Sequence, residues 1–140
     1  MKAILTSIAV SFLLLISAQV SRADDSAAYK VVIQVSDNDP AKWNLALNNA
    51  KNIQQELGKN NVQLEIVAYG PGIGMLKFDS EVGNRLTEAV GNGIFVAACG
   101  NTMKGQKLTP ADMHASAKIV PAGVVEIIKR QREGYAYIRP

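Results

Sequence analysis

The sequence predicts an α/β fold with three layers, α/β/α, in which the middle layer is a mainly parallel sheet of about five strands. Short β-branched apolar runs alternate along the chain with segments whose apolar residues recur every three or four positions, as in parallel βαβ units. Apolar residues make up 48% and charged residues 19% of the 140 residues, which favours one packed core. No repeat or linker-like segment interrupts this pattern, so we expect a single domain.

Residues 1–23 have the pattern of a secretory signal peptide. Lys2 precedes an apolar stretch, residues 3–16, that is shorter than a membrane span, and Ser21-Arg22-Ala23 has small residues at both ends. We expect cleavage after Ala23, with residues 24–140 forming the domain; a retained N-terminal anchor is the alternative. Cleavage would lower the formal charge from +3 to +1. We therefore expect a periplasmic protein with no membrane contact after cleavage and no nucleic-acid partner.

The first half of the domain contains two predicted strands separated by a helix. Residues 29–35 are a β-branched run typical of a buried strand. Asp39-Pro40 marks the start of a helix that ends at Gly58. Residues 62–69 form a second strand, whose alternating polar residues predict a less buried position than that of the first. The apolar face of the intervening helix consists of Trp43, Ala46, Leu47, Ala50, Ile53 and Leu57.

The middle of the chain predicts a turn, a helix and a strongly buried strand. Residues 70–74, Gly-Pro-Gly-Ile-Gly, interrupt regular structure. Asp79-Ser80-Glu81 is expected to cap a helix that continues to Val90. Residues 94–99 are an uninterrupted apolar run, which predicts the most buried and central strand, and Gly100-Asn101 ends it.

The last third predicts two helices and two short strands. Thr109-Pro110 has the form of a helix start, and residues 118–120 form a brief strand before Pro121. A helix from Val124 ends at Gly134, and residues 135–138 form the closing strand. Three basic residues near the end of that helix are expected to face solvent and complement its dipole: Lys129, Arg130 and Arg132.

Cys99 is the candidate catalytic residue. It follows the most buried predicted strand, and ligands of parallel α/β sheets bind outside the carboxyl ends of the strands. A helix N-terminus or a backbone nest beside it would lower the pKa of the thiol. We expect a partly exposed thiol with hydrogen-bond donors at Asn101 and Thr102; the alternative is a small buried apolar residue.

A crevice around Cys99 is predicted to bind a small ligand. No cofactor or metal is expected, because the glycines at 70–74 fit neither the dinucleotide pattern nor the P-loop pattern, and the chain has one cysteine and one histidine. His114 is not expected to act as a base for Cys99, since it falls within the helix predicted from Thr109. The candidate ligand-binding residues are Asn38, Trp43, Gly72, Met75, Asn101, Thr102 and Met103.

Three segments carry a resemblance to a known family. Residues 94–103, Ile-Phe-Val-Ala-Ala-Cys-Gly-Asn-Thr-Met, are followed by Val120-Pro121-Ala122-Gly123 at a helix start and by residues 131–138. In this order the chain resembles the DsrE/DsrF-like family, in particular its small exported single-domain members. The resemblance implies a three-layer α/β fold and a homo-oligomer, a trimer or hexamer. It also implies that Cys99 matches a cysteine that, in sulfur-relay members, accepts a sulfane sulfur as a persulfide.

Two functions follow as hypotheses. The first is a periplasmic sulfur carrier or sulfurtransferase-like protein that uses Cys99 as the persulfide acceptor, with a thiol or sulfur-donor protein as partner. The second is a non-catalytic oligomeric protein of the same fold that binds a small ligand or has a structural role.

Overall fold

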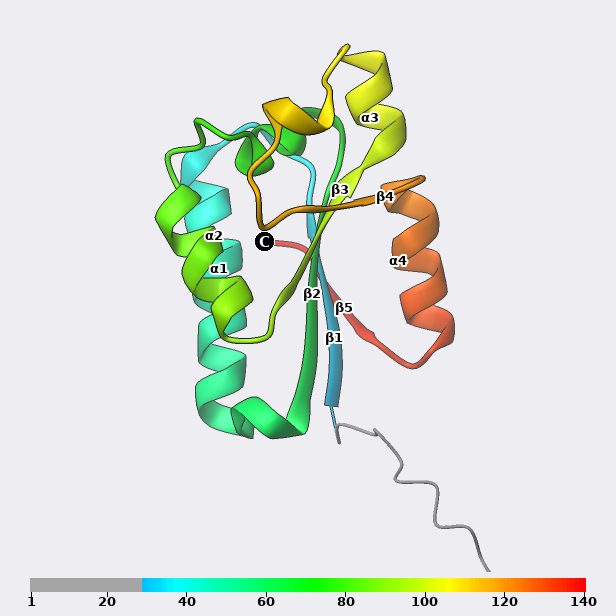
Figure 1. Ribbon diagram of the computed structural model, residues 1–140. Coiled ribbons are helices and arrows are strands. Elements are labelled where there is room, and N and C mark those ends of the chain that lie inside the picture. The colour runs from blue at the N-terminus through cyan, green and yellow to red at the C-terminus, as the bar shows by residue number, and fades with distance from the viewer. Residues whose placement is uncertain (1–28) are drawn as a thin grey trace, which may run out of the picture.

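The computed structural model describes residues 29–140, which form three layers with the sheet in the middle (Figure 1). Two helices, α1 (Pro40–Leu57) and α2 (Gly83–Gly91), cover one face of the sheet, and α4 (Gly123–Arg132) covers the other. The predicted α/β/α fold is confirmed. The predicted signal peptide lies outside the described residues. Within residues 29–140, no helix combines the length and apolar character that a bilayer crossing requires.

Five parallel strands make up the sheet. They are β1 (Tyr29–Val35), β2 (Val62–Ala68), β3 (Phe95–Cys99), β4 (Lys118–Val120) and β5 (Ala136–Ile138), in the order β4-β3-β2-β1-β5. The connections explain the layers: from β1 to β4 each new strand is added on the same side, so right-handed crossovers place α1 and α2 on one face. The connection from β4 returns to β5 at the opposite edge, and the same handedness places α4 on the other face.

The position of β2 corrects the sequence prediction. β2 lies in the centre of the sheet and is buried except for Gln63, whereas its polar residues predict a less buried strand. The strand tolerates a buried carboxylate because Glu65 pairs with Arg130 of α4. β3, predicted as the central strand, is second from the edge.

The start of α1 matches the prediction. Asp39 is the N-cap, and its Oδ1 accepts a hydrogen bond from the Ala41 N–H at 2.9 Å, with Pro40 in the first turn. The indole N–H of Trp43 donates to the carbonyl of Asp37 at 2.8 Å. These contacts fix the helix to the end of β1.

The helix predicted from Thr109 is wrong. Thr109 and Asp112 do form a capping box, but only the 3₁₀ turn Pro110–Asp112 follows it. Beyond the turn, Met113 bridges to Lys77, and the N–H of His114 donates to the Leu76 carbonyl at 2.8 Å. The backbone therefore pairs with a distant segment in place of continuing a helix.

The helix between β3 and β4 instead begins directly after Cys99, as α3 (Gly100–Gly105), where the sequence predicts only the end of a strand. Residues 70–74 also differ from the prediction, since they belong to a 3₁₀ helix, Gly70–Leu76. α2 begins at Gly83 without a side-chain cap, and the Ser80 Oγ accepts from the Val82 N–H at 3.4 Å. Asp79 and Glu81 therefore do not cap the helix.

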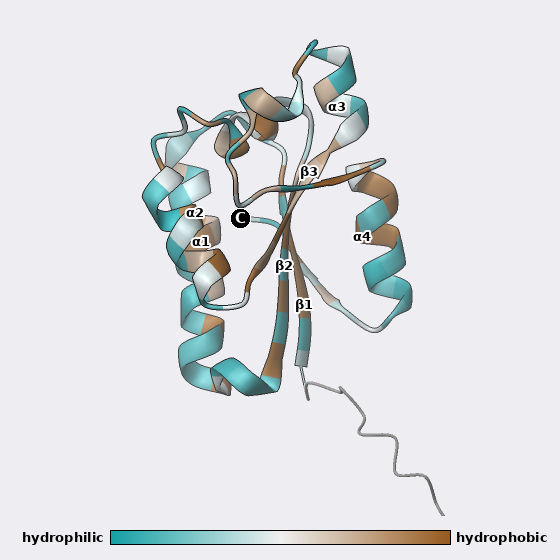
Figure 2. Cartoon of the chain, in the orientation of Figure 1, coloured by the Kyte–Doolittle hydropathy of each residue, from teal (hydrophilic) through white to brown (hydrophobic). Residues whose placement is uncertain are grey.

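Hydrophobic residues colour the central strands between the two helix layers (Figure 2). The buried clusters on the two faces of the sheet differ greatly in size. On the α1 and α2 face, alternate strand residues such as Ile33, Ile66 and Val96 pack against both helices and the 3₁₀ helix. On the α4 face the buried cluster consists of Val32, Val67, Ala97, Val120 and Ile127.

Candidate functional site

Cys99 lies where strand β3 becomes helix α3. It is the last residue of β3 and the N-cap of α3, and its Sγ accepts a hydrogen bond from the Thr102 N–H at 3.4 Å. Because β4 pairs with β3 through Cys99 and Val120, the chain reaches the start of α4 three residues beyond that pair. The first turns of two helices therefore meet at this thiol.

Two glycines allow this close approach. A Cβ added at Gly123 would lie 3.1 Å from the Cβ atoms of both Cys99 and Tyr69. A Cβ added at Gly100 would lie 3.0 Å from the carbonyl oxygen of Val120. Any side chain at Gly123 would therefore push the first turn of α4 away from the thiol.

The surroundings of Cys99 favour its thiolate. Burial is the largest single influence and raises the pKa of the thiol. The Thr102 hydroxyl and the N–H groups of Gly123, Thr102 and Asn101 together outweigh burial, so the pKa of Cys99 lies below its usual value. The Thr102 Oγ1 also accepts from the Gly70 N–H at 2.9 Å, which leaves the hydroxyl proton for the sulfur.

The exposure of Cys99 differs from the prediction. The residue is buried, with 5% of its surface exposed, where the sequence predicts a partly exposed thiol. The reason is tertiary: Gly123 closes over the cysteine from α4, and Tyr69 and Val67 of neighbouring chain segments pack against that glycine.

The predicted crevice residues divide into two groups. Asn101 and Thr102 lie beside Cys99, as predicted from their position. The others lie elsewhere: Trp43, Met75 and Met103 belong to the core of the α1 and α2 face, so these three are packing residues and do not line an open crevice.

Gly72 and Asn38 have separate surroundings. Gly72 is buried so closely against the backbone of Val35 that an added Cβ would clash with it. Asn38 lines a shallow hollow with Gly74, Lys77 and others, and Cys99 does not line that hollow. Ligand binding by these residues stays a prediction.

A second polar group, which the sequence prediction missed, lies under α4. Arg130 Nε forms an ion pair with Glu65 Oε2, and its other nitrogens contact Glu126 at 3.1 Å and Glu133 at 2.9 Å. Burial raises the pKa of Glu65 to about 7, against the opposing influence of Arg130. Arg130 was expected to face solvent; the available signal was the acidic residue Glu65 within an otherwise apolar strand.

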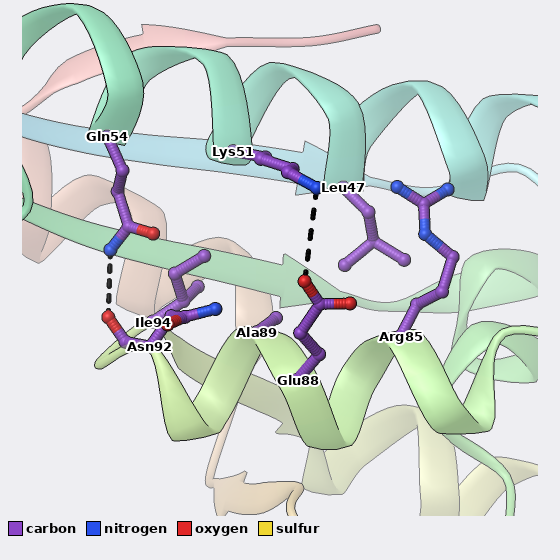
Figure 3. Close-up of a pocket in the computed structure, with 8 residues that line it drawn as sticks. All are labelled: Leu47, Lys51, Gln54, Arg85, Glu88, Ala89, Asn92 and Ile94. Carbon is purple, nitrogen blue, oxygen red and sulfur yellow. Dashed lines mark hydrogen bonds and ion pairs between the residues drawn. The ribbon is translucent and has the colours of Figure 1, made fainter.

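A hollow with an apolar floor lies between α1 and α2, with a volume of about 400 Å³. Lys51 and Glu88 face each other across it at 3.9 Å, and the Gln54 side chain donates to the Asn92 carbonyl at 2.9 Å (Figure 3). This hollow is on the face of the sheet opposite α4, and it is therefore separate from the thiol.

Residues 29–140 contain no group of three or more histidine, cysteine or acidic side chains that could hold a metal ion. His114 lies beside α2, with its Nε2 3.5 Å from the Thr87 Oγ1. Its backbone N–H donates to the Leu76 carbonyl, so His114 is held in a segment beside α2.

The sequence model of the DsrE/DsrF-like family matches residues 29–140. The chain belongs to this family. A solved structure of similar fold is the protein of unknown function MTH1491 from Methanobacterium thermoautotrophicum, with 35% identity and a TM-score of 0.77; the match covers 80% of this chain and 99% of that one.

Two more distant structures share the fold alone. The ychN protein from E. coli has 13% identity and a TM-score of 0.66, with 80% of this chain and 99% of that one covered. The protein of unknown function BT1422 from Bacteroides thetaiotaomicron has 14% identity and a TM-score of 0.63, with 82% and 97% covered. No curated protein matches the chain significantly.

Proposed function

We propose that this DsrE/DsrF-like protein is an exported sulfur carrier, in which Cys99 accepts a sulfane sulfur as a persulfide and passes it to a partner thiol. The observation that supports this function is the set of donors around Cys99 Sγ, with the Thr102 N–H at 3.4 Å. These donors lower the pKa of the thiol despite its burial. Because the thiolate is the nucleophile, a larger fraction of reactive sulfur is present near neutral pH.

The transfer step conserves atoms and electrons. The Cys99 thiolate attacks the outer sulfur of a sulfane donor such as thiosulfate, and a new S–S bond forms on the protein. The donor's own S–S bond breaks, and its electron pair leaves with sulfite. The same backbone donors that stabilise the thiolate would then face the negative charge of the persulfide.

The test is the intact mass of the protein after incubation with thiosulfate or polysulfide. The native protein is expected to gain one sulfur atom that a reductant removes, and Cys99→Ser is expected to gain none. Thr102→Ser retains a hydroxyl donor, whereas Thr102→Val removes it, so this pair is the matched control for thiolate stabilisation. A native protein without labile added sulfur, under conditions in which it stays folded, would rule out the carrier function.

A second candidate function is favoured by the burial of Cys99. With 5% of its surface exposed, the residue also fits a packing role in a non-catalytic oligomeric protein that binds a small ligand. Thiol alkylation of the folded protein distinguishes the two. Fast labelling with an apparent pKa below the usual value of about 8.5 supports the carrier, and labelling only after denaturation supports the second function.

We also propose that the protein is a homo-oligomer, a trimer or hexamer, located in the periplasm. Val124, Val125 and Ile128 form an apolar row on α4 with exposed fractions of 51%, 47% and 51%. A symmetric interface would cover such a row. Light scattering tests the assembly, and N-terminal sequencing of exported protein, expected to begin at Asp24, tests the localisation.

A further inference from the structure

Helix α4 covers one face of the sheet with few buried apolar side chains. Of its ten residues only Gly123 and Ile127 are buried, and the apolar cluster that the helix shares with the sheet has five buried members, Ile127 included. α4 thus rests on one large apolar side chain, on the close contact of Gly123 with Cys99, and on the ion pair of Arg130 with the sheet.

The ion pair under α4 is partly buried and joins residues 65 positions apart in the sequence. Glu65 is 2% exposed, and its Oε1 has no hydrogen-bond partner, so Arg130 is its one strong contact. Arg130 in turn contacts Glu126 of its own helix and Glu133 at the C-cap, which orient the guanidinium toward the strand. The ring of Tyr135 lies against it, with the guanidinium carbon 5.4 Å from the ring centroid.

The ion pair and the thiol lie at opposite ends of α4. Glu65 of β2 is paired with Phe95 at the start of β3, whereas Cys99 is at the end of β3. α4 spans this distance, since Gly123 contacts Cys99 and Arg130, seven residues later, contacts Glu65. At about 1.5 Å per residue the two contacts are roughly 10 Å apart along one short, stiff helix.

We propose that the Glu65–Arg130 ion pair is a positioning contact, which holds the first turn of α4 against Cys99 and so keeps the Gly123 N–H donor at its sulfur. This inference rests on the proposed function, because it concerns how the Cys99 thiolate is maintained. Within one subunit, Ile127 is the one large apolar side chain of α4 that is buried against the sheet, so the ion pair adds a second fixed point for the helix. A tilt of a few tenths of an ångström at Gly123 lengthens a hydrogen bond to the thiolate and weakens it.

Charge and position make opposite predictions, which allows a sharp test. If Glu65 acts on Cys99 only through its negative charge, Glu65→Gln lowers the pKa of the thiol, because a nearby anion is removed. If the ion pair positions α4, the same variant raises that pKa, because above pH 7, where Glu65 is ionised, a neutral amide holds Arg130 less strongly than the carboxylate does. Arg130→Lys keeps the positive charge but lacks the planar guanidinium whose separate nitrogens contact the three carboxylates, so only the positioning model predicts an effect from it.

The experiment measures the pKa of Cys99 by the pH dependence of alkylation in the native protein, Arg130→Lys and Glu65→Gln. Cys99 is the only cysteine, so labelling reports on it alone. We expect the pKa to rise by about one unit in Arg130→Lys, or about tenfold slower labelling near neutral pH, and by less in Glu65→Gln. Glu88→Gln breaks the exposed pair with Lys51 on the opposite face and is the matched control, with no change expected.

Hydrogen exchange at the first turn of α4 provides a second measurement that does not involve the thiol. Faster exchange at Gly123–Ile127 in both ion-pair variants, together with the higher pKa, supports positioning. An unchanged pKa in Arg130→Lys, or a lower pKa in Glu65→Gln, overturns it. If Arg130→Lys does not fold, Glu65→Gln alone decides through the sign of its shift. If the native protein forms no persulfide, the proposed function is wrong. The pKa values of Cys99 in the variants would still decide whether the ion pair positions α4.

Discussion

On the face covered by α1 and α2, the strands pack apolar side chains such as Ile33 and Ile66 against two helices, whereas on the α4 face the same strands also bury polar groups. Gln34 accepts a hydrogen bond from the Tyr137 hydroxyl at 2.6 Å, and Glu65 pairs with Arg130. An apolar interior stabilises the fold in proportion to the apolar surface area that it buries. Polar contacts contribute less to stability, but their geometry determines how two elements are oriented. The two faces therefore differ in role: the α1 and α2 face provides most of the stability, and the polar contacts of the other face orient α4 over Cys99.

The largest expected effect is loss of a side chain in the core of the α1 and α2 face. Ile66→Ala removes a fully buried side chain between tightly packed layers, and we expect it to lower the free energy of unfolding by about 4 kcal/mol. The matched change Ile127→Ala is expected to cost about 2 kcal/mol, because α4 can settle into the space. Denaturant unfolding measures both, and equal losses would contradict the difference between the faces.

The next effect concerns pH and lies on the α4 face. The pKa of Glu65 is raised in the folded protein to about 7 from 4.5, so the folded state binds the extra proton more tightly than the unfolded state. Its contribution to stability is therefore fully present below about pH 4.5 and is lost as the pH rises through 7. We expect a loss of about 3 kcal/mol across this window.

Glu65→Gln cannot titrate and should lack this dependence. Unfolding free energies measured by denaturant between pH 4 and 8 compare the two proteins. A stability curve of the native protein that has the same slope as that of Glu65→Gln would contradict the assignment.

A smaller effect is expected where α4 meets the thiol. Gly123→Ala places a methyl group about 3.1 Å from the Cys99 Cβ, so the first turn of α4 must shift. Alanine also has the higher helix propensity, by up to about 1 kcal/mol in a helix interior, which offsets part of the strain at this first helical residue. We therefore expect little change in the melting temperature but a rise in the pKa of Cys99 of up to about one unit, measured by alkylation against pH. An unchanged pKa of Cys99 would show that the position of α4 does not influence the thiol.

The smallest effect is expected from the exposed pair Lys51–Glu88 on the α1 and α2 face. The two groups are 3.9 Å apart and more than half exposed, so Lys51→Ala should change the free energy of unfolding by less than about 0.5 kcal/mol. Added salt should weaken this pair further, while the buried Glu65–Arg130 pair should respond little. Denaturant unfolding at low and high salt makes the comparison, and a large salt-sensitive loss in Lys51→Ala would contradict it.

The sequence was sufficient for most elements because their signals are local. The β-branched run at 29–35, the Asp39-Pro40 cap and the helix ending before Gly134 each depend on neighbouring residues alone, and the structure confirms them. The helix predicted from Thr109 failed for the opposite reason: its capping box is real, but a backbone bond from His114 to the distant Leu76 carbonyl diverts the chain.

The sequence by itself determined the α/β class, the alternation of strands and helices, and the place of Cys99 at the end of β3. Only the tertiary structure decided that β2 is central, that Arg130 turns inward to Glu65, and that Gly123 closes over the thiol. The physical reason is sequence distance. Periodicity and capping depend on residues within a few positions of one another. The pKa of Cys99 and the burial of Glu65 depend instead on the face of the sheet on which the β4-to-β5 crossover places α4.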